Sequence, residues 1–535
     1  MRYTDKPTVS RLYIFAIVVL FLASRLAHAQ PQIPSPGKTN QSQSVIRSNS
    51  RLVVLDVVVT DKAGHPITGL TKDDFRVLED GKPQVIANFE PADTHFGNIS
   101  TSPASVDTKR APASFVAADR PETILVLDEL NTSSVDASFA WQMLIKYLRK
   151  QPATLADPTS IMVLTKQRLT KIADLTQDTS VLLDKARKIE LELPSHSAEN
   201  GIQGAADLML TSLLALDEIA LSTANRQTHK NVIWIGTGFP ILSSYGVDLV
   251  DRERFLSYIR YTANWMQETR TTIYTIDPRG LPVDETVILT SSLGSTFVGQ
   301  DFGSVSGELM FESLAPATGG KIFRNRNDVD VALATAAANG ATYYTLAYYP
   351  QNSSFDGKFR RIDVQIVDRP ELIRTTQQGY YAIDEGLGAS QSELDFALSR
   401  AVTSPLPFAS VQFDALGKVL LAPPATARFS VSVDRNTLSW NSLPNGDQRT
   451  EITVVIAEMA KKSAVLNYKV KEMEIVVPKA EFENSTNHRV VFTVNAPLPA
   501  KTDHLRFVIR DAATGRLGTY DAPRQGLGQQ LAASK

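Results

Sequence analysis

The residue types that most enzymes use for chemistry are present in this chain, but they do not stand in catalytic arrangements. The seven histidines are dispersed, and no His-Glu-x-x-His motif places two imidazoles on one face of a helix. The nearest approach to a nucleophile elbow is Gly303-Ser-Val-Ser-Gly307, in which Val305 occupies the position that requires serine. No glycine-rich loop ends in Lys-Ser or Lys-Thr, as a nucleotide-binding loop does. The sequence therefore predicts a protein that is not an enzyme.

Two aspartates follow apolar segments, at points where a sheet can collect polar side chains. Asp128 follows residues 123–127, and Asp277 follows residues 272–276. Ligands of open α/β sheets bind beside the carboxyl ends of the strands, so Asp277 is a candidate for that edge. Its neighbour Pro278 favours a turn that Asp277 initiates. Asp128 is equally suited to bracing a turn, since Asp side chains accept hydrogen bonds from free backbone N–H groups.

The segments that would position these aspartates alternate between strand and helix patterns from residue 120 to residue 340. Residues 123–127 are apolar throughout, as in a parallel strand with both faces buried, and residues 136–150 carry large apolar side chains at helical spacing. The other predicted strands are 160–164, 169–175, 231–235, 272–276 and 321–323. The other predicted helices are 179–189, 202–224, 249–268, 307–317 and 329–338. This alternation predicts an α/β domain with a doubly wound, Rossmann-type parallel sheet.

Strand patterns also lie on both sides of the α/β segment. Residues 51–92 and residues 341–384 each predict about three strands, a number that is marginal on its own. We therefore expect these two β segments to pack on each other, with the α/β domain inserted between them. Residues 385–405 predict a helical connector, and residues 406–522 contain strands at the spacing of an immunoglobulin-like β-sandwich. Residues 523–535 predict a disordered polar tail.

The first residues have the three parts of a secretory signal peptide. Basic residues precede the apolar run 12–23, and Ala27-His-Ala29 supplies the small residues that a signal peptidase requires. The alternative is a membrane anchor, but the run is shorter than the roughly 20 residues that a spanning helix needs. The sequence predicts cleavage after Ala29, a linker over residues 30–50, no stable membrane span in the mature chain, and a secreted or periplasmic protein.

Composition limits what holds the fold together and what it binds. The chain has 535 residues, no cysteine and 43% apolar residues, so disulfides are excluded and the fold must rest on its cores. Lys and Arg number 55 against 57 Asp and Glu, which gives a net charge of −2. This balance offers no basic excess for a phosphate backbone, and nucleic acid is not an expected partner.

Aromatic side chains are further candidates for a binding surface. Trp234 and the pairs Tyr343-Tyr344 and Tyr348-Tyr349 lie in segments with strand patterns. Interfaces are enriched in such residues. In strands, however, aromatic side chains more often pack in the core and across strands, and this interpretation is favoured.

A series of short motifs follows a specific order between residues 51 and 384. The motifs are Leu55-Asp-Val-Val-Val-Thr-Asp61, Leu70-Thr-Lys-Asp-Asp-Phe75, Glu79-Asp-Gly81, Val126-Leu-Asp-Glu-Leu-Asn-Thr132, Val232-Ile-Trp-Ile-Gly-Thr-Gly-Phe-Pro240, Ile273-Tyr-Thr-Ile-Asp-Pro-Arg-Gly-Leu281, Thr318-Gly-Gly-Lys321 and Gly379-Tyr-Tyr-Ala382. In this order they resemble the von Willebrand factor A fold and, more narrowly, the VWFA-related acidobacterial domain family of exported bacterial proteins. The resemblance implies an α/β, doubly wound von Willebrand A-like domain flanked by β-sandwich domains.

The resemblance also implies a cation site. In von Willebrand A domains a D-x-S-x-S loop after the first strand holds Mg²⁺, with a Thr and an Asp from other loops. Asp128 and Thr132 match the first and last positions of that loop, whereas Leu130 replaces the middle Ser and Asn131 offers an amide oxygen. The strand that should end in Asp ends in Gly236-Thr-Gly238. Asp128, Asn131 and Thr132 thus form a degenerate site, at which Mg²⁺ or another divalent cation is expected to bind weakly or not at all.

These features together predict an exported, non-enzymatic binding, adhesion or assembly protein that engages a protein or extracellular matrix partner. One alternative is an envelope enzyme or metal-dependent regulator with a site built from loops, for which residues 280–306 would form the lid. A purely structural envelope component is a third. An enzyme requires polar groups that converge in a pocket, whereas a binding protein requires only an exposed patch, and this difference separates the alternatives.

Overall fold

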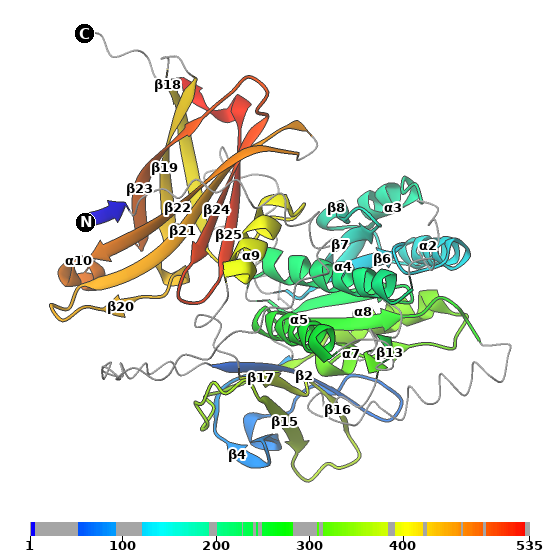
Figure 1. Ribbon diagram of the computed structural model, residues 1–535. Coiled ribbons are helices and arrows are strands. Elements are labelled where there is room, and N and C mark those ends of the chain that lie inside the picture. Colours follow the sequence, from blue (N-terminus) through cyan, green and yellow to red (C-terminus); the bar gives the residue numbers. More distant parts are fainter. Residues whose placement is uncertain are drawn as a thin grey trace, which may run out of the picture. The chain divides into compact units, whose positions relative to one another are not determined.

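The computed structural model describes residues 2–5, 52–92, 120–191, 201–226, 228–238, 242–243, 249–281, 308–309, 314–382, 391–420, 425–461, 464–484 and 488–529. The chain divides into two compact units (Figure 1). The first, which we call the α/β unit, comprises Leu52–Asp384 and Ser404–Ser410. The second, the C-terminal unit, comprises Met1–Arg51, Glu385–Thr403 and Val411–Lys535. The predicted signal peptide beyond residue 5, the linker 30–50 and most of the insertion 280–306 lie outside the described residues.

The centre of the α/β unit is a six-stranded mixed sheet with the order β13-β11-β9-β6-β7-β8. Its strands are β6 (Glu122–Asp128), β7 (Thr154–Leu164), β8 (Leu169–Asp178), β9 (Lys230–Ile235), β11 (Thr271–Ile276) and β13 (Ile322–Phe323). All neighbours are parallel except β7 and β8. The prediction of an entirely parallel sheet is therefore wrong for β8. Residues 165–168 form a tight turn, whereas a parallel connection needs a dozen residues or more.

Helices cover both faces of this sheet (Figure 1). The helices are α2 (Ser134–Arg149), α3 (Thr179–Arg187), α4 (Gly201–Ser222), α5 (Leu249–Glu268), α7 (Leu314–Ala317) and α8 (Val329–Ala341). Side chains of α4, α5 and α7 share one core with Val126 and Trp234, and those of α2, α3 and α8 share another with Leu127 and Ile235. Alternate residues of each central strand thus enter opposite cores, which explains why these strands are apolar throughout. None of the described helices is long and apolar enough to cross a membrane.

One predicted helix differs from the structure. The spacing of apolar residues predicts a helix over residues 307–317, but Glu308–Leu309 is a short strand, β12, which pairs with β10 (Leu242–Ser243). The described helix α7 begins only at Leu314. It is followed by Gly319 in a left-handed conformation with φ of 88°, which ends the helix.

The two β segments interleave their strands in two four-stranded sheets, which we call the β module. Their orders are β16-β2-β14-β5 and β17-β15-β3-β4. The strands are β2 (Val53–Thr60), β3 (Phe75–Glu79), β4 (Lys82–Gln84), β5 (Ile86–Glu90), β14 (Tyr344–Tyr348), β15 (Phe359–Ile366), β16 (Ile373–Thr375) and β17 (Gly379–Tyr381). Both sheets contribute to one hydrophobic core. The α/β domain is therefore inserted within a module whose strands come from either side of it in the sequence.

The C-terminal unit is built from two further sheets around one core. Their orders are β1-β22-β21-β24-β25, with β20 beside β21, and β23-β19-β18-β26. The strands are β1 (Arg2–Asp5), β18 (Phe413–Leu420), β19 (Thr426–Asp434), β20 (Asn441–Ser442), β21 (Gln448–Met459), β22 (Val465–Val477), β23 (Arg489–Pro497), β24 (His504–Asp511), β25 (Leu517–Pro523) and β26 (Gly528–Gln529). A short helix, α10 (Lys479–Asn484), follows β22.

Two boundaries of the C-terminal unit differ from those that the sequence predicts. The helix expected as a connector, α9 (Gln391–Thr403), packs on β24 and β25 and belongs to this unit. The expected disordered tail from residue 523 contains β26, which pairs in parallel with β18 through Gly528. A two-residue strand has too little pattern for sequence periodicity to detect it.

Candidate functional site

The carboxyl ends of β6 and β9 meet at the point where the strand order reverses, and the predicted site residues lie there. With strands numbered along the chain, the sheet has the order 3-2-1-4-5-6, in which ligands bind between the first and fourth strands. Asp128 is the last residue of β6, and Gly236 follows β9. The local sequence explains the turn after β6, because Ser133 caps α2 by accepting a hydrogen bond of 3.2 Å from the backbone N–H of Asp136.

Asp128 is completely buried and accepts hydrogen bonds from both sides of this edge. The backbone N–H of Asn131 donates to Oδ1 at 3.0 Å, and Asn131 Nδ2 lies 2.9 Å from Oδ2. The indole Nε1 of Trp234 also donates to Oδ2, at 3.0 Å. Burial raises the pKa of Asp128, and the hydrogen bonds from Asn131, Trp234 and the backbone of Gly238 oppose that rise. Asp128 therefore joins the loop after β6 to β9.

Thr132 and Thr237 form a second link across the same edge. The backbone N–H of Thr237 donates to Thr132 Oγ1 at 3.1 Å, and Thr237 Oγ1 donates to the carbonyl of Asn131 at 2.8 Å. Gly236 permits this approach, because a Cβ there would lie 2.5 Å from Asp128 Cβ and 2.6 Å from Thr132 Oγ1. The glycine that replaces the expected carboxylate thus has a packing role.

The three residues predicted as a cation site are brought together, but their donor set does not fit Mg²⁺. Both oxygens of Asp128 already accept N–H groups, and Asn131 turns its Nδ2 donor toward them. Asn131 Oδ1 is buried and has no hydrogen-bond partner among the described residues. Thr132 Oγ1 is engaged by Thr237. The described ranges contain no group of three or more His, Cys, Asp or Glu side chains that could hold a metal ion.

Asp277 does not join this network. It accepts hydrogen bonds from the backbone N–H of Arg279 at 3.0 Å and from the Arg279 guanidinium at 2.6 Å, as an aspartate that initiates a turn does. Its strand, β11, is separated from β6 by β9. Asp277 therefore stabilises its own loop on another part of the edge.

Exposed side chains lie along the carboxyl edge of the sheet. Val135, in the first turn of α2, is 78% exposed, and Leu281, after β11, is 60% exposed. Between β7 and β8, the turn residues Lys166, Gln167 and Arg168 are also exposed. The loop after β6 is held in place, since the backbone N–H groups of Glu129 and Leu130 both donate to the carbonyl of Leu164. This edge presents apolar and basic side chains on a braced support.

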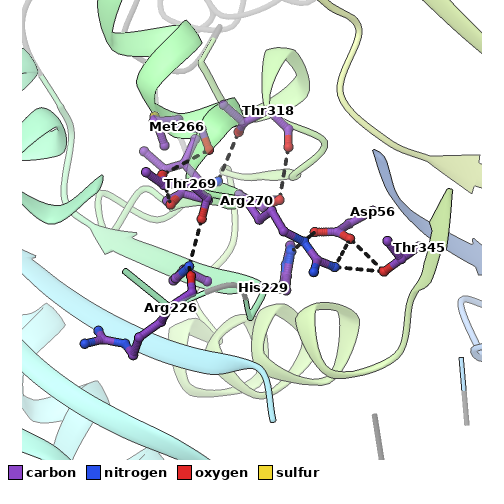
Figure 2. A network of polar contacts seen from close by, with 12 residues as sticks. Asp56, Arg226, His229, Met266, Thr269, Arg270, Thr318 and Thr345 are labelled. Carbon is purple, nitrogen blue, oxygen red and sulfur yellow. Dashed lines mark hydrogen bonds and ion pairs between the residues drawn. The ribbon is translucent and has the colours of Figure 1, made fainter. Parts of the chain in front are cut away.

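A second buried polar cluster lies at the amino-terminal edge of the sheet, where the β module meets it (Figure 2). Asp56 of β2 accepts a hydrogen bond from Arg270 Nη2 at 2.5 Å and lies 2.8 Å from His229 Nδ1. Thr345 of β14 donates to Asp56 Oδ1 at 3.1 Å and accepts from Arg270 Nη2 at 2.8 Å. Burial opposes the ionisation of Asp56, but the charges of Arg270 and His229 outweigh it and hold the pKa of Asp56 well below its usual value.

Further charged groups extend this cluster beneath β6 and β9. Arg226 forms an ion pair with the buried Glu122 at 2.5 Å. Lys230 is completely buried, and its Nζ donates to the carbonyls of Thr269, at 2.9 Å, and Arg226. Burial lowers the pKa of Lys230 to about 7. Arg226 is 40% exposed, but Asp56, Glu122, His229 and Lys230 are buried, so the main role of the cluster is to join the β module to the sheet.

Replacing Lys230 with methionine is expected to change how stability depends on pH. Above pH 7 the folded chain releases the Lys230 proton, whereas the unfolded chain keeps it up to pH 10.5. The unfolded state then binds more protons, so the wild type gains stability relative to Lys230→Met at about 1.4 kcal/mol per pH unit. Urea unfolding at pH 7 and pH 9.5 measures this gain. A constant difference between the two proteins would contradict the lowered pKa.

The comparisons with known proteins show likeness in the fold only. No family model and no curated protein matches the chain. Similar solved structures include BatB from Bacteroides thetaiotaomicron, with 13% identity, a TM-score of 0.25, and coverage of 41% of this chain and 98% of that one. A mutant of the PilB minor pilin from Streptococcus sanguinis has 9% identity, a TM-score of 0.25 and coverage of 53% and 77%. The VWA domain of SpRpn10 has 13% identity, a TM-score of 0.16 and coverage of 32% and 94%. The solved structures similar to this chain thus include a VWA domain.

Proposed function

We propose that this chain is an exported, non-enzymatic binding protein that engages a protein or matrix partner through a von Willebrand A-like domain of the VWFA-related family. The partner contacts the carboxyl edge of the sheet. The observation that carries the proposal is the braced loop after β6, which presents the exposed Val135 at the point where the strand order reverses. In doubly wound sheets this is the place where ligands bind.

The chemistry of the edge favours binding over catalysis. A catalytic site needs polar groups that converge on a substrate, with a nucleophile or base free to react. Here Asp128, Asn131, Thr132 and Thr237 are hydrogen-bonded to one another beneath the surface. Among the described residues, the side chains that reach solvent at this edge include the apolar Val135 and Leu281 and the basic Lys166 and Arg168, as in the exposed patch of a binding protein. Such an edge recognises a partner with an apolar centre and acidic residues around it.

Replacing Val135 with glutamate is expected to abolish partner binding without unfolding the chain. The substitution places a charge in the apolar part of the proposed interface, where a desolvated, unpaired carboxylate costs several kcal/mol. Capture from the envelope fraction of the exporting cell, followed by mass spectrometry and a binding titration of the captured protein, measures the loss. An affinity reduction of about 100-fold corresponds to roughly 2.7 kcal/mol.

Val181→Glu is the matched control for this experiment. Val181 is also exposed, at 42%, and also lies in the first turn of a helix, α3. That helix follows the antiparallel strand β8, so Val181 stands at the opposite edge of the sheet. Binding should survive Val181→Glu. Equal loss in both variants, or loss in neither, would show that the partner does not contact the carboxyl edge.

The exported form of the protein should begin at Gln30. Ala27-His-Ala29 is the one well-placed pair of small residues after the apolar run, and a signal peptidase cleaves behind such a pair. Amino-terminal sequencing of protein recovered from the envelope or the medium of the exporting cell checks this. A chain that still began at Met1 in those fractions would show that the segment is retained.

A further inference from the structure

The strand β23 forms one edge of its sheet, and its outer side pairs with no strand among the described residues. On its inner side it pairs with β19 over all nine residues, from Arg489 to Pro497, without a register shift. In an antiparallel pair, alternate residues direct their backbone N–H and C=O groups away from the neighbouring strand. The outer edge of β23 therefore offers a row of backbone donors and acceptors to a further strand.

This edge lacks the features that keep edge strands from pairing with other chains. Those features are charged side chains, proline, bulges and short length. The only charge of β23 is at Arg489 and its only proline is Pro497, and both stand at its ends. Residues 490–496 carry no charge, proline or glycine, the composition of segments that pair readily. By contrast, the edge strand β8 contains Lys171 and Asp174 and has register shifts.

The side chains of β23 leave this edge accessible and uncharged. Val491, Thr493 and Asn495 lie on the outer face of the sheet and are exposed, Val491 at 44%. Phe492 and Val494 point the other way, into the core of the C-terminal unit. Neither face offers a charge near the middle of the strand that would select an acidic or a basic segment. A strand that binds here must therefore be neutral over the same length.

A second copy of β23 fulfils this condition. A two-fold axis through Thr493, perpendicular to the sheet, makes the two strands antiparallel and opposes residues that are equally distant from Thr493. All nine residues of each strand then pair. Thr493 lies opposite Thr493, and Phe492 lies opposite Val494, which are both kinds of pair that stabilise antiparallel strands. Arg489 lies opposite Pro497, so no like charges meet.

We propose that two copies of this chain form a dimer in which their β23 strands pair in antiparallel fashion about Thr493. The pairing joins two four-stranded sheets into one continuous sheet. Each copy offers this edge once, so the pair is closed and does not extend into a filament. The contact involves only the C-terminal unit, so it is tested independently of the partner site that is proposed for the α/β unit.

Exchange of charge across the pair tests the contact on the full exported chain. Sedimentation velocity should show a dimer of the wild type at micromolar concentration. Val491→Lys/Asn495→Lys should raise its dissociation constant about 30-fold, because residue 491 of each copy faces residue 495 of the other and lysine then opposes lysine twice. Val491→Glu/Asn495→Glu should have the same effect. A mixture of the two variants should form a dimer again, since each lysine then faces a glutamate.

Single cysteines test the register, because the chain contains no cysteine of its own. Under mild oxidation, Thr493→Cys should form a disulfide-linked dimer, since only residue 493 meets its own copy in this register. Asn495→Cys, on the same exposed edge, should form one at least tenfold more slowly, because it faces Val491 instead. Faster linkage through residue 495 than through residue 493 would contradict the pairing about Thr493.

Leu416→Lys/Ser430→Lys is the matched control for the charge variants. Both residues are exposed on the same face of the sheet as Thr493, but they lie on β18 and β19, away from the edge. The control should leave the dimer unchanged. A monomeric wild type, an assembly larger than a dimer, or a dimer that persists in both charge variants would overturn the proposal. So would variants that do not associate on mixing. A monomer would leave this edge to a strand of another protein.

Discussion

Asp56→Ala is expected to lower the free energy of unfolding of the α/β unit by about 3 to 5 kcal/mol, the cost of breaking a buried ion pair by removing one partner. The variant leaves Arg270 and His229 in a buried site without the carboxylate that both contact. It also removes the polar link between β2 and the turn before β11. Urea unfolding followed by the fluorescence of Trp141, Trp234 and Trp265, which all lie in this unit, measures the loss.

Arg270→Gly distinguishes the effect of the Arg270–Asp56 ion pair on stability from the effect of the backbone conformation at residue 270. Arg270 has a φ of 55°, a left-handed conformation that costs a non-glycine residue about 1 to 2 kcal/mol. In the wild type, glycine relieves this strain but removes the guanidinium beside Asp56, so the net effect should be destabilising. In the Asp56→Ala background, glycine removes both the strain and a buried cation that has lost its carboxylate, so it should stabilise the chain. The sign of the effect should therefore reverse.

Asp184→Ala controls for the general effect of losing an aspartate that forms an ion pair. Asp184 pairs with Lys188 at 2.7 Å on the exposed side of α3, where water screens the two charges and the loss of the pair costs little stability. A loss at Asp56 no larger than this, or an Arg270→Gly effect with the same sign in both backgrounds, would show that the cluster does not join the β module to the sheet.

Lowering the pH should reduce the contribution of Asp56 to the free energy of unfolding. Its pKa is held below the unfolded value of 3.8, so the unfolded state binds more protons as the pH falls past that value. The difference between wild type and Asp56→Ala should therefore shrink as the pH falls below 4. At neutral pH the contribution of Asp56 to the free energy of unfolding has its full value.

The elements of the α/β unit follow largely from local sequence, whereas strand direction and some strands do not. Apolar periodicity predicts the strand 231–235 and the helix 202–224, close to β9 and α4. It does not predict that β8 is antiparallel, because direction depends on the connection. In the C-terminal unit, apolar periodicity misses β18 and β25, where glycines interrupt the pattern. A Cβ at Gly417 would lie 2.3 Å from Phe429, and one at Gly518 would lie 1.9 Å from the carbonyl of Val411, so packing requires both glycines.

The two polar clusters differ in how far sequence predicts them. Asp128, Asn131 and Thr132 lie in one loop, so their proximity follows from their spacing. Their partners Trp234, in β9, and Thr237, just after it, lie about a hundred residues later, and only the strand order places them there. Asp56 gives one local signal, a carboxylate inside the apolar run of β2, which indicates a buried charge that needs a partner. Nothing local to Arg270 or His229 identifies them as that partner.

Asp128→Ala is expected to lower the free energy of unfolding by about 2 to 4 kcal/mol, because it removes the acceptor of two buried donors at about 1 to 3 kcal/mol each, with partial relaxation. The donors are the backbone N–H of Asn131 and Nε1 of Trp234, whereas Asn131 Nδ2 keeps its hydrogen bond of 3.0 Å to Ser212 Oγ. Trp234→Phe, which keeps a ring but removes one donor, should cost less. Both are measured by urea unfolding, with circular dichroism as the signal so that the loss of a tryptophan does not matter.

The same variant decides whether Asp128 braces the fold or holds a cation. A cation that binds the folded state raises its melting temperature, and the stabilisation grows with the logarithm of the ratio of cation concentration to Kd. If Asp128 braces the edge, 10 mM Mg²⁺ or Mn²⁺, or EDTA, should leave the melting temperature of the wild type unchanged, and calorimetric titration should give no saturable heat. If Asp128 holds a cation, both ions should stabilise the wild type but not Asp128→Ala. In EDTA the variant should then have the same stability as the wild type, because removing an unpaired buried carboxylate has no cost. A large loss of stability in Asp128→Ala, measured in EDTA, therefore shows that Asp128 is a structural brace and not a cation ligand.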